Sequence, residues 1–103
     1  MKTLKFDKKY YLPILNGDKT QTLRKNNKRL QEGEIIKAYF PGTGLSCKIR
    51  ITKTGYKQFK YLNDVDAKRE GYDMLDELRG ELMKFYPTID KLDRLYWYRF
   101  KVL

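Results

Sequence analysis

The residues best suited to chemistry in this chain lie together in one octet, residues 17–24, with the sequence GDKTQTLR. The octet contains two cations, Lys19 and Arg24, together with aspartate, threonine and glutamine side chains, and it follows the apolar segment 10–15. A hydrophobic core seldom selects such side chains. The octet therefore predicts the rim of a site that binds an anionic or polar ligand.

Three side chains of the octet offer distinct chemistry. Lys19 could contact a phosphate or, where desolvated, act as a base or nucleophile with a lowered pKa; a solvated surface lysine is the alternative. Thr22 could supply a hydroxyl nucleophile or a substrate hydrogen bond, although a β-branched residue also simply suits a strand. Arg24 could hold a phosphate or carboxylate through two parallel hydrogen bonds, or pair with an acid such as Glu70.

Glu70 is the acidic candidate, and it stands where a short helix is expected to end. A carboxylate at the C-terminal end of a helix opposes the helix macrodipole. This unfavourable position points to a role, either pairing with Lys19 or Arg24 or accepting a proton. A solvated last turn is the alternative.

Basic residues outnumber acidic residues by 23 to 13, which gives a formal net charge of +10. Such an excess predicts a polyanionic partner, RNA or a nucleotide above all, with simple solubility as the alternative. We expect the basic side chains that follow the octet, Lys25, Lys28 and Arg29, to contact this anion together with Thr20. A membrane surface is not expected as a partner, because no lysine-rich face accompanies a sustained apolar face.

The chain has no histidine and one cysteine, Cys47. These counts exclude an intrachain disulfide, a Ser-His or Cys-His catalytic pair and the usual zinc ligand sets, so we expect no metal and no cofactor. There is no run of about 18 apolar residues to span a membrane, and the first residues lack the apolar stretch of a signal peptide. We therefore expect a cytoplasmic protein, and a monomer.

A single α+β domain over residues 1–103 is expected to position these groups. Periodicity and β-branched residues predict strands at 4–6, 20–24, 34–40, 45–53 and 95–102. Short helices are predicted after a cap at Asp7, at 63–70, and from a cap at Asp73 to about residue 86, while 55–61 is either a bent strand or a loop. About five to six strands with two or three short helices fit a small β-barrel, closed or nearly closed.

The strand of the octet raises a question of geometry. A regular strand places Thr20 and Thr22 on one face and would place Lys19 on the other. Lys19 and Thr22 can act on the same ligand only if Lys19 belongs to the preceding turn, or if a bulge redirects it.

These residues resemble the ASCH domain family, a branch of the PUA-like barrels. The family pattern is Gly-x-Lys-Thr-x-Thr-x-Arg, then a strand led by glycine, an Ala-x-x-Glu-Gly-aromatic segment, a Leu-rich helix ending in Tyr-Pro, and a last strand ending in Phe-Lys. The matches run through nearly the whole chain, at 17–24, 33–36, 67–72, 85–87 and 100–101. The resemblance implies a small β-barrel with a cleft between barrel and helices, and a role in RNA metabolism.

One bacterial branch of this family looks like an amidohydrolase that removes acetyl groups from 4-N-acetylcytidine. Its functional residues fall on Lys19, Thr22 and Glu70 of this chain. The resemblance implies that Thr22 is the nucleophile, that Lys19 takes its proton, and that Glu70 orients or shares that proton. The branch lacks this chain's basic excess, and its glutamate is not followed by Gly-aromatic, as Glu70 is by Gly71 and Tyr72.

Three functions follow as hypotheses. The first is an RNA- or nucleotide-binding protein, in which the basic side chains and Tyr72 hold the ligand. The second is a metal-independent amidohydrolase that acts on 4-N-acetylcytidine or a related acylated nucleoside through Lys19, Thr22 and Glu70. The third is a ribonuclease that uses the same cations to stabilise phosphate charge.

Overall fold

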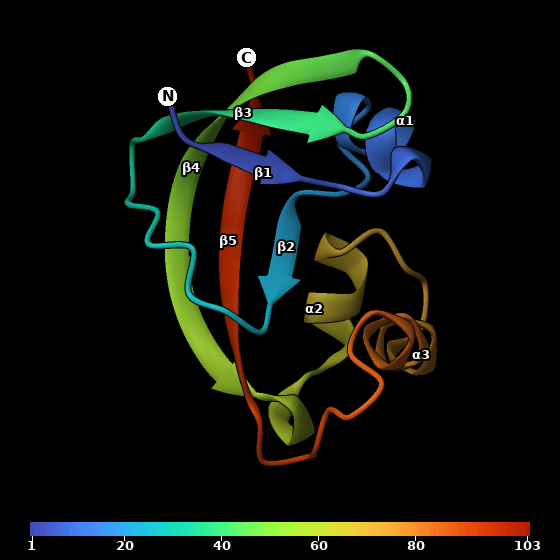
Figure 1. Cartoon of the computed structure of the whole chain (residues 1–103). Coiled ribbons are helices and arrows are strands. Elements are labelled where there is room, and N and C mark those ends of the chain that lie inside the picture. The colour runs from blue at the N-terminus through green and yellow to red at the C-terminus, as the bar shows by residue number, and fades with distance from the viewer.

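The computed structural model describes residues 1–103 as a curled, mixed five-stranded sheet with three helices (Figure 1). The strands are β1 (Thr3–Lys5), β2 (Gln21–Arg24), β3 (Ile35–Phe40), β4 (Leu45–Gln58) and β5 (Arg94–Val102). The helices are α1 (Tyr11–Leu15), α2 (Asp64–Arg69) and α3 (Leu75–Phe85), with 3-10 turns η1 (Lys8–Tyr10) and η2 (Phe59–Tyr61). The predicted α+β class and the predicted elements are confirmed.

The strand order β1-β3-β4-β5-β2 leaves β1 and β2 at the two edges of the sheet. Only β1 and β3 run parallel, and every other neighbouring pair is antiparallel. The 14-residue β4 pairs with β3 along its first half and with β5 along most of its length, and a bulge interrupts its register between Ile51 and Lys53. A long, bulged strand bends and twists strongly, which curls the sheet into a half-barrel.

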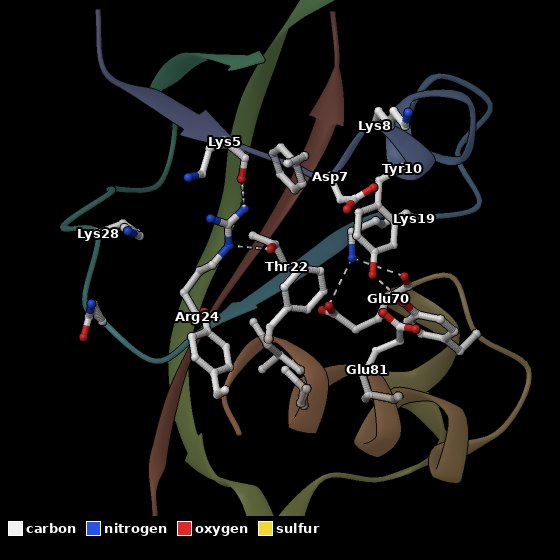
Figure 2. A pocket seen from close by; sticks show the side chains of 18 of the residues that line it. Lys5, Asp7, Lys8, Tyr10, Lys19, Thr22, Arg24, Lys28, Glu70 and Glu81 are labelled. Atoms are coloured by element: carbon white, nitrogen blue, oxygen red, sulfur yellow. Dashed lines mark hydrogen bonds and ion pairs between the residues drawn. The ribbon is translucent and has the colours of Figure 1, made fainter. Parts of the chain in front are cut away.

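One side chain joins the two edges of the half-barrel. Nη2 of Arg24, on β2, donates a hydrogen bond of 2.7 Å to the main-chain carbonyl of Lys5, on β1 (Figure 2). The predicted barrel is therefore nearly closed, and an arginine side chain rather than a strand ladder makes the connection across the gap.

Two hydrophobic clusters lie on opposite faces of the sheet. The first is built on the inward side chains of β1, β3, β4 and β5 together with Ile14 of α1 and Leu30. The second lies between the sheet and the pair α2 and α3. β5 contributes to both, with Tyr98 and Phe100 in the first cluster and Leu95 in the second. A pocket described below is lined by members of both clusters.

The observed start of α3 differs from the predicted one, whereas the start of α2 agrees with the prediction. Asp73 does not cap α3: the cap residue is Met74, whose backbone is extended, and the helix starts at Leu75 without a side-chain cap. Asn63 does cap α2, in a capping box with Asp66. The ambiguous segment 55–61 divides into the end of β4 and the turn η2. None of the helices has the length and apolar character that crossing a bilayer requires.

Candidate functional site

The turn that follows α1 answers the question of geometry raised by the octet. Gly17 adopts a left-handed conformation, with φ of +84°, and the main-chain N–H of Lys19 donates to the carbonyl of Pro13 at 3.0 Å. The strand β2 begins only at Gln21. Lys19 therefore belongs to the turn, and strand alternation does not govern where its side chain points.

A pocket of about 710 Å³ opens between η1, β2 and the helices α2 and α3 (Figure 2). Lys19, Thr22 and Glu70 all line this pocket, and each of them is buried. Pockets for small ligands commonly have volumes of about 300–1,000 Å³. The structure therefore brings the three residues that the sequence selected into one cavity of ligand size.

The Lys19 ammonium and the Glu70 carboxylate form a buried ion pair at the base of this pocket. Nζ of Lys19 lies 3.1 Å from Oε1 of Glu70 and 3.2 Å from the Glu70 main-chain carbonyl. Glu70 is the C-terminal cap of α2, where unpaired carbonyls carry partial negative charge. The ammonium thus neutralises a helix end and a carboxylate together, which resolves the unfavourable position of Glu70 noted in the sequence.

Burial shifts both members of the pair toward their neutral forms. Desolvation lowers the pKa of Lys19 from its usual 10.5, and the negative charge of Glu70 opposes this only in part. Desolvation likewise raises the pKa of Glu70, against the opposing effect of Lys19. A lysine whose pKa is lowered carries more of the free amine at neutral pH, which is the form that accepts a proton.

One oxygen of Glu70 has no partner within the protein. Oε1 accepts from Lys19, whereas the buried Oε2 makes no hydrogen bond. A buried carboxylate oxygen without a donor is costly, and such atoms often mark a catalytic or binding role. Oε2 therefore retains an unused capacity to accept a hydrogen bond.

Arg24 holds the hydroxyl group of Thr22 in place. Nε of Arg24 donates to Oγ1 of Thr22 at 2.9 Å, while the same guanidinium bridges to Lys5 and lies 4.9 Å from the ring of Phe6. Because Thr22 Oγ1 is the acceptor, its own hydroxyl proton remains available for donation. Arg24 thus contacts Thr22, and Lys19 rather than Arg24 pairs with Glu70.

Two tyrosines flank the ion pair. The hydroxyl groups of Tyr10 and Tyr72 hydrogen bond to each other, and the ring of Tyr10 lies 4.6 Å from Nζ of Lys19. Both line the pocket, and desolvation raises the pKa of each phenol. Tyr72 is among the predicted binding residues, whereas Tyr10 is not, because it lies in the apolar segment 10–15.

The predicted anion-binding residues divide between the pocket and the surface. Lys28 lines the pocket with Arg24 and Tyr72. Lys25 and Arg29 lie outside the lining: Lys25 forms an ion pair with Asp93 at 3.5 Å, and Arg29 is exposed with a left-handed backbone. Thr20 is tied by main-chain hydrogen bonds to α2 and β5 and also lies outside the lining.

Sequence reasoning missed the cations that the N-terminal segment supplies. Lys5 and Lys8 line the pocket, and both are exposed. The alternation of residues 4–6 indicates that Lys5 points away from the core. The sequence alone does not show that β1 comes close to β2, so it does not place Lys5 at the pocket. The structure contains no group of three or more His, Cys, Asp or Glu side chains arranged to hold a metal ion.

Comparisons with known proteins bear on the fold. No family model matches the sequence, and no curated protein matches it. An ASCH domain from Lactobacillus crispatus superposes with a TM-score of 0.78 at 19% identity, over 98% of this chain and 78% of that chain. A DUF984 protein from Enterococcus faecalis gives a TM-score of 0.79 at 17% identity, over 100% of this chain and 76% of that chain. A hypothetical protein gives 0.75 at 18% identity, over 100% of both chains. The chain therefore has an ASCH-type fold.

Proposed function

We propose that the pocket binds an acylated nucleoside, with 4-N-acetylcytidine as the leading candidate, and hydrolyses its amide bond. The observation that carries this proposal is that three buried residues, Lys19, Thr22 and Glu70, line one pocket, with Lys19 and Glu70 paired at 3.1 Å. A hydroxyl group, an amine with a lowered pKa and a partly unpaired carboxylate together form a nucleophile, a base and a proton carrier.

The first half of the reaction transfers the acyl group to the protein. Oγ1 of Thr22 attacks the carbonyl carbon of the amide, and the free amine of Lys19 accepts the hydroxyl proton. The carbon–nitrogen bond then breaks, the nucleoside amine leaves with a proton delivered by the pair Lys19 and Glu70, and an ester remains on Thr22.

The second half releases the acid. Lys19 takes a proton from water, the resulting hydroxide attacks the ester carbonyl, and Thr22 recovers its proton as the carboxylic acid departs. Arg24 supports both halves, because a cationic N–H donor on Oγ1 stabilises the negative charge that develops there. Oε2 of Glu70, which has no partner within the protein, would accept an N–H of the bound base or amide.

Turnover of 4-N-acetylcytidine by the purified protein tests the proposal. We expect release of cytidine and acetate, and loss of this release in Thr22→Val, which removes the hydroxyl group at constant shape. Thr52→Val is the matched control, because Thr52 is exposed on β4 and lies outside the pocket lining. Turnover in Thr22→Val equal to that of the unchanged protein would sink the proposal.

A second candidate is binding of RNA or a nucleotide without turnover. It is favoured by the three exposed lysines of the pocket lining, Lys5, Lys8 and Lys28, which would attract a phosphate group. Equilibrium dialysis with cytidine monophosphate should then show binding that weakens as salt rises. Binding of the nucleotide, with no release of acetate from 4-N-acetylcytidine in the separate turnover assay, would select this candidate. Cleavage of an oligoribonucleotide by the purified protein would select the ribonuclease.

A further inference from the structure

The positive charge of this protein is concentrated on its sheet. The five strands contain no aspartate or glutamate, although the chain has 13 acidic residues. Their basic residues are Lys5, Arg24, Lys37, Lys48, Arg50, Lys53, Lys57, Arg94, Arg99 and Lys101. All acidic side chains therefore lie on helices, turns and loops, and the strands carry the excess of positive charge.

Six of these cations face one another directly across neighbouring strands. In the register of the sheet, Lys37 lies opposite Lys48, Arg50 opposite Lys101, and Lys53 opposite Arg99. The positions that alternate with them, such as Ile36, Ile49 and Phe100, are buried in the first core cluster. The six side chains therefore point away from that core, and we refer to them as the cationic face.

No acidic side chain forms an ion pair with the cationic face. None of its side chains takes part in the ion pairs of the structure, and five of the six residues are exposed, with Arg99 partly exposed beside Trp97. Like charges directly opposite each other destabilise a sheet. These three pairs therefore lower the stability of the folded protein, and a bound polyanion would offset the repulsion between them.

We propose that the cationic face binds the phosphate backbone of RNA, at a surface distinct from the pocket. A row of cations on adjacent antiparallel strands can follow an extended polyanion, and β4 pairs with β3 on one side and with β5 on the other. Figure 1 shows the curved β4 running beside β5. An anionic membrane fits less well, because interfacial binding also needs a sustained apolar face. The central strand β4 instead presents Ser46, Lys48, Arg50 and Lys53 on its outward side.

Binding of a labelled oligouridine tests this proposal through paired charge variants. Lys48→Gln, Arg50→Gln and Lys101→Gln together remove half of the cationic face. Lys60→Gln, Lys68→Gln and Lys91→Gln together remove the same charge from exposed positions outside it. We expect the first triple variant to bind more than about tenfold more weakly at low salt, and its slope of log K against log salt to become shallower by about 2, since each phosphate contact contributes about 0.7.

Thermal unfolding separates lost binding from lost structure. Because the first triple variant removes repulsion between like charges, we expect it to unfold at an unchanged or higher temperature while it loses RNA affinity. The control triple variant should retain the affinity to within about twofold. Equal loss of affinity in both triple variants would mean that only net charge matters, and would overturn the assignment to this face.

Two further arms identify the partner and the surface. Loss of oligouridine binding in a variant that combines Lys5→Gln, Lys8→Gln and Lys28→Gln, with binding retained in the first triple variant, would place the RNA at the pocket instead. Hydrolysis of 4-N-acetylcytidine should be unchanged in the first triple variant, so failure of the proposed hydrolase and failure of this RNA surface remain distinguishable. Binding to vesicles of phosphatidylserine and phosphatidylcholine, without binding to oligouridine, would overturn the choice of RNA.

Discussion

The ammonium of Lys19 lies 3.1 Å from the carboxylate of Glu70, although 51 residues separate them in the chain, and their side chains are only 3% and 5% exposed. One comes from the turn after α1, and the other ends α2. The ion pair therefore fixes the position of the helical layer against the octet. Burial lowers the pKa of Lys19, and the Glu70 carboxylate of the pair opposes this shift only in part.

Removal of either partner of this ion pair should destabilise the protein strongly. Lys19→Met or Glu70→Leu leaves one charge buried without its counter-ion, and we expect each to lower the free energy of unfolding by about 3–5 kcal/mol. The double variant removes both charges, and its stability should return to within about 1 kcal/mol of the unchanged protein. Urea unfolding of all four proteins measures the coupling.

Stability and activity should separate in the double variant. If the pair is catalytic, the restored stability is not accompanied by restored turnover of 4-N-acetylcytidine. A double variant that is stable and fully active would show that the pair only holds α2 against the octet.

The rate of hydrolysis should rise with pH. Lys19 accepts a proton only as the free amine, and its pKa lies below the usual 10.5 because burial disfavours the ammonium form. The value of kcat/KM should therefore reach its plateau at a lower pH than it would if the base were an exposed lysine. Glu70 raises the pKa of Lys19, so the remaining activity of Glu70→Gln should rise at a still lower pH. Profiles of kcat/KM against pH for both proteins measure the shift, and a shift to higher pH would contradict this account.

The sequence predicted the fold class and the residues of the ion pair for physical reasons that are local. The glycine that ends α1, the alternation of the strands and the capping box of α2 all act within a few residues, so their effects can be read from neighbours in the chain. Glu70 drew attention because a carboxylate is unfavourable at a helix C-terminus, and the structure supplies the ammonium that offsets it.

The rest of the site depends on contacts between distant segments. Whether Lys19 and Thr22 share a pocket depends on the start of β2 at Gln21, and thus on a main-chain hydrogen bond to Pro13 that alternation does not reveal. The contact of Tyr10 with Tyr72 joins residues 62 positions apart. The bridge from Arg24 to Lys5 requires the two edge strands to meet, and no local pattern specifies the curl of a sheet.

Replacement of Arg24 by lysine should lower kcat more than it raises KM. Arg24 contacts Thr22, Lys5 and the ring of Phe6 with one planar group, and a lysine has no fork that can make the two hydrogen bonds at once. Loss of one preorganised donor to a developing oxyanion costs about a hundredfold in kcat. Steady-state kinetics on 4-N-acetylcytidine measure both constants.

The matched control for this variant is Arg94→Lys. Arg94 stacks on the exposed ring of Tyr56 and lies outside the pocket lining, so this conservative change should leave both constants unaltered. If Arg24→Lys changed KM alone, Arg24 would bind substrate without stabilising the reacting oxygen.

Two glycines should respond to alanine with opposite signs. Gly55 on β4 lies opposite Trp97 on β5, and a Cβ at Gly55 would collide with the Trp97 indole, which Arg99 contacts in turn. The indole is confined between its neighbours, so we expect Gly55→Ala to lower the free energy of unfolding by about 1–3 kcal/mol. Gly80 lies inside α3 with open space around its Cα, and Gly80→Ala should raise the free energy of unfolding by about 0.5–1 kcal/mol. Urea unfolding at one temperature compares the two, and equal effects would mean that the indole does not pack on β4 as the structure has it.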